Sequence, residues 1–194
     1  MIFLFFSLAC QEKEQPELTN QELYAKYCGL CHGYNGEGYL ADAANALSNP
    51  EFLSIASDPF LIYATAYGRP ETKMSAWAES QGGPLSDQEI ERIISYIREW
   101  ETIENKETDF SVEGNIENGR LVYADYCQAC HGENGEGESA LSLNSPTFLE
   151  SIDDGFLWYS IIKGRPGTTM IAYEDILSEE EISDVVALIR AWEE

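Results

Sequence analysis

The feature that most constrains the fold of this chain is an internal repeat. Six blocks of residues recur in the same order, at separations that drift from 99 to 92 residues. Tyr27-Cys28 returns at Tyr126-Cys127, and Leu85 near the end of the first unit returns at Leu177. Shared order with drifting spacing indicates two homologous units that differ by short loop deletions. We therefore expect two tandem domains with a polar linker between them, at residues 18–102, 115–194 and 103–114 respectively.

Each unit is predicted to be helical. Residues 19–28 and 116–128 are predicted to form short amphipathic helices that run into a cysteine motif. The final helix of each unit begins with a capping box, at residues 86–89 and 178–181. Behind each box, apolar residues share one helical face and a tryptophan closes the helix: Ile90, Ile93, Ile94, Ile97 and Trp100; Ile182, Val185, Val186, Ile189 and Trp192. We therefore expect an all-α protein with a few helices in each unit.

Both units contain the sequence Cys-x-x-Cys-His, at residues 28–32 and 127–131. Two thiols three residues apart on one helical turn can add to the two vinyl groups of one porphyrin, and the histidine that follows can ligate its iron. We therefore expect two covalently attached haem c groups. The expected attachment residues are Cys28, Cys31, Cys127 and Cys130, and the expected axial ligands are His32 and His131. A macrocycle would also add apolar core to domains that are marginal at about 85 residues.

Three other uses of a Cys-x-x-Cys pair remain open from the sequence alone. Two such pairs can build one four-thiolate zinc site, although the gap between them exceeds the usual spacing. A redox-active dithiol would suit a thioredoxin-like pattern of alternating strands and helices, which this sequence lacks. Structural disulfides would suit an oxidising compartment. The recurrence of the whole motif in two homologous units favours haem over all three.

The residue counts restrict the second axial ligand of each iron. The chain has two histidines, and both belong to the Cys-x-x-Cys-His motifs, so bis-histidine iron within the chain is excluded. Apart from Met1, the methionines are Met74 and Met170, 42 and 39 residues after their histidines. Each ends a matched Gly-Arg-Pro-x-x-x-Met segment. A lone methionine is commonly core filler, but equivalent methionines in two matched loops favour a role as iron ligands.

The chain resembles a tandem of class I cytochrome c domains over about residues 18–194. The resemblance is carried by the segment Gly-Arg-Pro-Gly-Thr-Thr-Met at 164–170 and by the capped helix after it, which ends in Arg-Ala-Trp. It implies three or more helices around each haem, one exposed haem edge and His/Met iron. It also implies that Arg69 and Arg165 each neutralise a haem propionate in a charge-assisted pair. The alternative for both arginines is an ordinary surface charge, which contributes little.

Two positions depart from the pattern of that family. Such domains usually have a proline about a dozen residues after the haem histidine, and its carbonyl accepts from the histidine ring. Here the first prolines, Pro50 and Pro146, come 18 and 15 residues on, so the acceptor is undetermined. The family also favours glycine where the first helix crosses the last. Gly119 fits that position, whereas Asn20 replaces it in the first unit and predicts looser or shifted packing.

The charge is strongly unbalanced, with 11 Lys and Arg against 35 Asp and Glu and a net charge of -24. This excludes nucleic acid as a partner, because its phosphates require positive charge. It also opposes binding to anionic lipid headgroups. Basic redox proteins are a possible class of partner, since complementary fields speed transient encounters. The alternative is an acidic surface that serves solubility alone.

The N-terminus contains an apolar run that ends at Cys10 and is too short to span a bilayer. Ser7-Leu8-Ala9-Cys10 resembles a lipoprotein cleavage box, although Ser7 stands where an aliphatic residue is usual and no basic segment precedes the run. We expect a signal with a lipidated Cys10 at residues 1–10 and a tether at 11–17. The chain would then be lipid-anchored on the periplasmic side of a bacterial membrane. An ordinary signal fragment with an incidental cysteine is the alternative.

His/Met ligation raises the reduction potential and leaves no open iron position for a small-molecule substrate. The expected function is single-electron transfer between respiratory or periplasmic redox proteins, by a carrier that is not an enzyme. One alternative is a permanent electron-transfer subunit of a membrane-bound oxidase, quinol-oxidising or dehydrogenase complex. Another is a di-haem peroxidase, which needs an iron with an exchangeable ligand. The two methionines disfavour the peroxidase.

Overall fold

The structure is a computed structural model that describes residues 17–41, 44–70 and 72–193. Within these ranges the chain is helical, and the one β-type contact is an isolated bridge between Ala78 and Leu85. The predicted all-α fold is confirmed. The predicted signal at 1–10, with Cys10, and the tether up to residue 16 lie outside the described residues.

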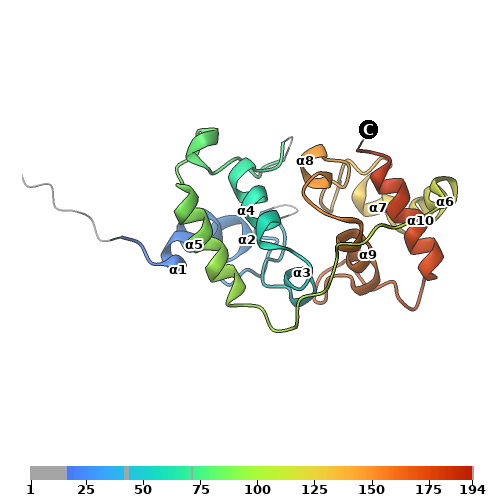
Figure 1. Cartoon of the computed structure of the whole chain (residues 1–194), viewed down its shortest axis with the longest axis horizontal. Helices are drawn as coiled ribbons and strands as arrows, with labels where there is room; N and C mark the ends of the chain where they lie inside the picture. The colour runs from blue at the N-terminus through green and yellow to red at the C-terminus, as the bar shows by residue number, and fades with distance from the viewer. Residues whose placement is uncertain (1–16, 42–43, 71, 194) are drawn as a thin grey trace, which may run out of the picture.

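The helices form two groups that lie side by side (Figure 1). The first group contains α1 (Asn20–Tyr27), α2 (Gly29–His32), α3 (Pro50–Leu53), α4 (Asp58–Tyr67), the 3-10 turn η1 (Glu79–Gln81) and α5 (Asp87–Arg98). The second contains α6 (Ile116–Tyr126), α7 (Gln128–His131), α8 (Pro146–Leu149), α9 (Asp154–Lys163) and α10 (Glu179–Arg190). Five α-helices of each group correspond in order, so both units of the repeat are built on one plan. The unit boundaries at 18–102 and 115–194 stay predictions.

The final helices α5 and α10 begin and pack as their sequences predict. In α5, Ser86 Oγ accepts from the Glu89 N–H at 3.3 Å, and the Glu89 carboxylate accepts from the Ser86 N–H at 2.9 Å. Ser178 and Glu181 make the same reciprocal pair at 3.2 and 2.8 Å in α10. The apolar face of each helix is buried: Ile90, Ile93, Ile94 and Ile97 in α5; Ile182, Val185, Val186 and Ile189 in α10. Each capping box satisfies backbone N–H groups in the first turn of its helix, and the apolar face of the helix packs into the core.

A buried tyrosine joins the first helix of each unit to the loop after its cysteine motif. The Tyr24 hydroxyl donates to the Gly33 carbonyl at 2.7 Å, and Tyr123 donates to Gly132 at 2.9 Å. The ring of Tyr24 meets Trp100 edge-on at 5.0 Å, and Tyr123 meets Trp192 at 5.1 Å. The two closing tryptophans therefore fix the first helix of each unit against the last.

Helices α4 and α9 are absent from the sequence prediction. Both are capped, because Ser57 Oγ accepts from the Phe60 N–H at 3.3 Å and Asp153 Oδ1 accepts from the Phe156 N–H at 2.7 Å. Their sequences are apolar around most of the helix, so no polar stripe reveals the 3.6-residue period. These two helices carry the central side chains of the contact between the units.

Four phenylalanines form the apolar core of that contact: Phe52, Phe60, Phe148 and Phe156, each 4–6% exposed. The Phe60 and Phe156 rings lie 5.2 Å apart, and the Phe52–Phe156 and Phe60–Phe148 pairs lie 6.5 and 6.4 Å apart. Because Phe52 corresponds to Phe148 and Phe60 to Phe156, the cluster is built from two equivalent pairs. Rings at these distances add to the stability that apolar burial alone provides.

The segment 103–114 connects the units and is fastened to both of them (Figure 1). On the first unit, Lys106 pairs with Glu51 at 2.9 Å and donates to Ser54 Oγ at 3.0 Å. On the second, the Val112 N–H donates to Asp154 at 2.8 Å. The predicted linker is thus an extended connection with side-chain contacts along its length.

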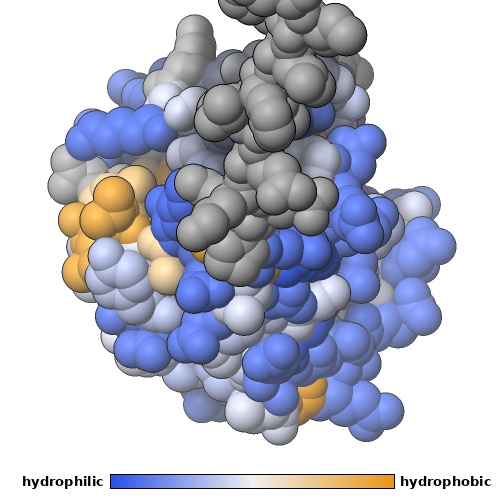
Figure 2. Space-filling model, turned by 90° about the vertical axis from the view of Figure 1, so that its left-hand side faces the viewer, coloured by the Kyte–Doolittle hydropathy of each residue, from blue (hydrophilic) through white to orange (hydrophobic). Residues whose placement is uncertain are grey.

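The face drawn in Figure 2 is mostly hydrophilic, with a hydrophobic group near the left edge of the view and a smaller hydrophobic spot low on the right. This agrees with the acidic composition of the chain. Among the residues that the structure describes, no helix has both the length and the apolar character needed to cross a membrane.

Candidate haem sites

The predicted cofactor residues of the first unit line one cavity. It lies between α2, α4 and α5, and its walls include Cys28, Cys31, His32 and Met74. The second unit has a corresponding cavity, whose walls include Cys127, Cys130, His131 and Met170. The structure therefore brings together each set of four residues that the sequence proposes for one haem. Their roles as attachment sites and iron ligands stay predictions.

All four cysteines of these motifs are free thiols. Burial raises the pKa of Cys28 to about 12 and that of Cys127 to about 11, so both are protonated thiols near neutral pH. The two pairs lie in different cavities, and among residues 17–41, 44–70 and 72–193 no group of three or more His, Cys, Asp or Glu is placed to hold a metal ion. Because the two cysteine pairs line different cavities, they do not come together as one four-thiolate zinc site.

Each motif histidine is oriented by a backbone carbonyl. His32 Nδ1 lies 2.8 Å from the Asn45 carbonyl, and His131 Nδ1 lies 3.0 Å from the Leu141 carbonyl. With Nδ1 protonated as the donor, Nε2 is the free nitrogen that an iron needs. Burial lowers the pKa of both histidines, which keeps the rings neutral and able to ligate. The acceptors come 13 and 10 residues after their histidines, so residues other than proline supply the carbonyls.

A threonine two residues before each methionine shapes the methionine loop. Thr72 Oγ1 donates to the Arg69 carbonyl at 2.8 Å and accepts from the Met74 N–H at 3.1 Å. Thr168 makes the same two bonds around Met170, at 2.8 and 3.1 Å. These threonines were not predicted from the sequence, although their repetition two places before each methionine is a usable signal.

Arg69 and Arg165 line the cavities and are partly buried, and their predicted contact with a haem propionate stays a prediction. Burial lowers the pKa of each to about 10. Arg165 donates to the Gly164 carbonyl and to Ser160 Oγ, both at 2.8 Å. Among the described residues, no carboxylate forms an ion pair with either arginine. A partly buried cation with no ion-pair partner among the described residues fits a cofactor that brings its own carboxylates, as haem does.

The two cavities meet at the contact between the units. Six residues line both of them: Asn45, Phe52, Phe60, Arg69, Ala140 and Leu141. This set includes both residues whose carbonyls orient the histidines, and two of the four interface phenylalanines. Each cavity is therefore completed by side chains from the other unit. The repeat alone does not reveal this, because it aligns the units without saying which faces touch.

Comparison with known proteins places the chain in a family. It matches the family described as cytochrome C oxidase, cbb3-type, subunit III, over residues 17–97 and 114–189. The chain belongs to this family. The two matched ranges fall on the two units of the repeat, so the chain is a c-type cytochrome with two haem c groups.

Two curated relatives cover both units. The cbb3-type cytochrome c oxidase subunit FixP of Bradyrhizobium sp. is 25% identical over 95% of this chain and 66% of its own length. The CcoP subunit of Azospirillum sp. is 24% identical over 84% of this chain and 57% of its own length. The chain thus spans less than two thirds of these relatives. A chain of the reducing HAO-like protein complex of Kuenenia stuttgartiensis shares the fold, with a TM-score of 0.50, 16% identity, and coverage of 89% of this chain and 94% of its own.

Proposed function

We propose that this cytochrome transfers single electrons between redox proteins through two six-coordinate His/Met haems, one in each unit. The observation that carries this proposal is the common wall of the two cavities, which contain equivalent sets of ligating residues. Two one-electron centres held against one interface form a relay within a single chain. When bound, each haem supplies an Fe(II)/Fe(III) couple.

The residues of each unit have separate roles in this proposal. The cysteines, Cys28 with Cys31 and Cys127 with Cys130, would attach one haem each through thioether bonds. His32 and His131 would each supply one iron ligand, with their tautomer set by the Asn45 and Leu141 carbonyls. Met74 and Met170 would supply the other, which would leave no iron position for a substrate. The apolar walls disfavour the extra positive charge of ferric iron and raise both potentials.

Spectroscopy of the isolated holoprotein tests these assignments. Pyridine haemochrome analysis is expected to give two haems per chain, and the ferric protein should show the thioether-to-iron charge-transfer band in the far red from both. Met74→His and Met170→His should each remove half of that band, lower one midpoint potential and keep the iron six-coordinate. Met74→Leu is expected to produce one high-spin haem. A native protein with a high-spin haem that turns over peroxide would contradict the proposal and favour a peroxidase.

A second candidate function is that of a permanent electron-transfer subunit of a cbb3-type oxidase. The family match and the names of the FixP and CcoP relatives favour it. Purification of the native protein in mild detergent separates the two candidates. An oxidase subunit is expected to co-purify in fixed proportion with other haem proteins and with oxygen-consuming activity. A free carrier should elute alone with two haems.

We also propose that the chain is exported and anchored by a lipid on Cys10, on the periplasmic side of the membrane. The support is the apolar run that ends in Ser7-Leu8-Ala9-Cys10. Mass spectrometry of the mature N-terminus should find an acylated Cys10, and Cys10→Ser should release the protein into the soluble fraction. An unmodified N-terminus downstream of Cys10 would contradict the anchor.

Because the chain is so acidic, its partners are proposed to be basic redox proteins, with association that slows as salt increases.

A further inference from the structure

The two arginines of the repeat occupy different places with respect to the cavities. Arg69 lines both the cavity of its own unit and that of the second unit, whereas Arg165 lines only the cavity of the second unit. The sequences around them match, Gly-Arg-Pro in each case. The difference therefore comes from how the units meet and not from the repeat itself.

The contacts of Arg69 explain its position between the cavities. Its guanidinium lies 5.8 Å from the ring centre of Phe60 in its own unit and 4.8 Å from that of Phe148 in the other unit. Cation–π contacts hold a guanidinium in place without neutralising its charge.

Arg165 is held and balanced in another way. Two of its nitrogens donate to Gly164 and Ser160 of its own unit. Its contact across the interface is with Phe52, at 5.7 Å. The carboxylate of Glu51 acts on it through its charge and opposes the lowering of its pKa by burial. Among the residues that the structure describes, no carboxylate opposes the lowering of the Arg69 pKa by burial.

We propose that Arg69 is a cation shared by both haem sites and raises the reduction potential of both, while Arg165 acts on the haem of the second unit alone. This rests on the proposed electron-transfer function. A positive charge beside a haem favours the ferrous form, which carries one positive charge fewer than the ferric form. Neutralising a propionate has the same sign. Removal of Arg69 should therefore lower two potentials, and removal of Arg165 should lower one.

Spectroelectrochemical titration of the holoprotein tests this with Arg69→Gln and the matched control Arg165→Gln. The two waves are first assigned with Met74→His and Met170→His, each of which displaces one of them. Arg69→Gln is expected to lower the ferrous-to-ferric ratio of both haems, at a fixed applied potential, by at least about threefold, where tenfold corresponds to about 59 mV. Arg165→Gln should shift only the wave of the second unit. A purely structural role for Arg69 would lower the unfolding midpoint without moving both potentials in the same direction.

Each remaining outcome decides the proposal. If Arg69→Gln shifts one wave or neither, the shared role is wrong. If Arg69→Gln fails to retain both haems, Arg69→Leu is titrated instead, because it removes the charge but keeps an apolar side chain against the Phe60 and Phe148 rings. Downward shifts of both waves would then support the proposal, and a shift of one wave, or of neither, would overturn it. Failure of the electron-transfer function itself would be seen in the native protein, as a haem count other than two or a missing thioether band.

Discussion

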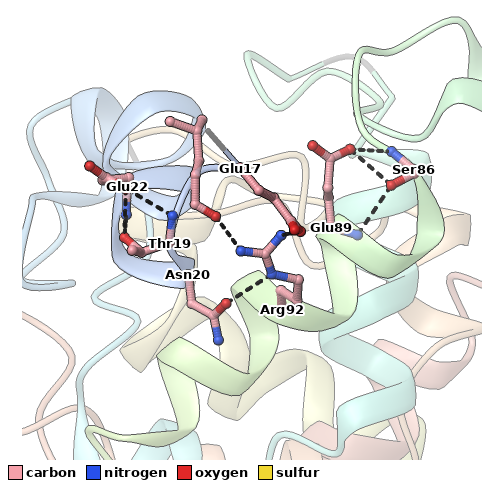
Figure 3. A network of polar contacts seen from close by, with 8 residues as sticks. Glu17, Thr19, Asn20, Glu22, Ser86, Glu89 and Arg92 are labelled. Atoms are coloured by element: carbon pink, nitrogen blue, oxygen red, sulfur yellow. Dashed lines mark hydrogen bonds and ion pairs between the residues drawn. The ribbon is translucent and has the colours of Figure 1, made fainter. Parts of the chain in front are cut away.

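In each unit, one side chain of the final helix binds the start of the first helix. The final helices are equivalent, but this side chain is a cation in the first unit and an anion in the second. In the first unit, Arg92 of α5 donates from Nε to Asn20 Oδ1 at 2.9 Å. Its two other nitrogens bond the Glu17 carboxylate and the Leu18 carbonyl (Figure 3). The entering chain is thus held by a cation. Thr19 caps the helix in a box with Glu22, beside this network.

In the second unit an acid stands at the position of Arg92. Asp184 of α10 is 3% exposed and accepts from the Asn115 N–H at 2.5 Å and from Asn118 Nδ2 at 2.6 Å. The helix α6 starts three residues earlier, relative to the repeat, than α1 does, so it extends past the crossing with α10. At that crossing is Gly119, where a Cβ would overlap the Asp184 carbonyl oxygen.

This difference explains why Asn20 replaces the glycine that the family favours. Because α1 begins at Asn20, its side chain lies at the end of the helix, where Arg92 binds it. The first helix of the first unit therefore starts at the crossing, whereas that of the second unit extends past it. The residue at this position of the final helix can therefore hold the N-terminal segment of its unit either as a cation (Arg92) or as an anion (Asp184). The starting residue of the first helix differs between the two cases.

Substitution of equivalent interface phenylalanines should reduce stability by the same amount in both units. Phe60 and Phe156 are equivalent, nearly fully buried and in contact with each other. Phe60→Ala and Phe156→Ala are each expected to lower the free energy of unfolding by about 3–5 kcal/mol, the usual effect of removing a buried ring. Guanidinium unfolding of the holoprotein measures both. A difference of more than about 2 kcal/mol, well beyond ordinary mutational scatter, would show that one unit supplies most of the interface stability.

Substitutions where the first helix crosses the last should reduce stability by very different amounts in the two units. Gly119→Ala places a methyl group against the Asp184 carbonyl, which is backbone and cannot move aside, so we expect a loss of about 3 kcal/mol from overpacking. Asn20→Ala in the first unit removes one hydrogen bond and should lower the stability by about 1 kcal/mol. Thermal unfolding of the two variants compares them. Equal losses would contradict the close crossing of α6 and α10.

Removing the charged residue of the final helix should also cost more stability in the second unit than in the first, but the difference should be smaller than at the helix crossing. Asp184→Ala leaves the Asn115 N–H and the Asn118 amide without their acceptor, and we expect a loss of about 2 kcal/mol. Arg92→Ala breaks an ion pair with Glu17, whose side chain is 80% exposed, and should cost about 1 kcal/mol or less. Added salt should weaken the effect of Arg92→Ala and leave that of Asp184→Ala nearly unchanged. If salt changes both equally, Asp184 is not a buried hydrogen-bonding group.

The sequence predicts what is encoded locally and misses what depends on how the units meet. Capping boxes and the Cys-x-x-Cys-His motifs specify their own surroundings, so both final helices and the grouping of Met74 with His32 were predictable. The acceptors of the histidine rings were not, because every residue has a carbonyl and Asn45 and Leu141 carry no distinguishing side-chain signal. The shared position of Arg69 was also hidden, since Arg165 lies in a matching sequence.

The smallest expected effect lies in the capping boxes of α5 and α10, where the units agree. Hydrogen bonds from the Ser86 backbone and side chain lower the pKa of Glu89, and those from Ser178 lower the pKa of Glu181. A carboxyl with a lowered folded pKa stabilises the protein above its unfolded pKa, about 4.3, and this contribution is lost as the pH falls through the folded value. Glu89→Gln and Glu181→Gln should therefore destabilise slightly and equally at neutral pH, and lose that effect in acid. Urea unfolding between pH 7 and the acid range, with exposed Glu91→Gln as control, measures the difference. A loss that persists undiminished in acid would mean that the caps act through packing and not through the carboxylate charge.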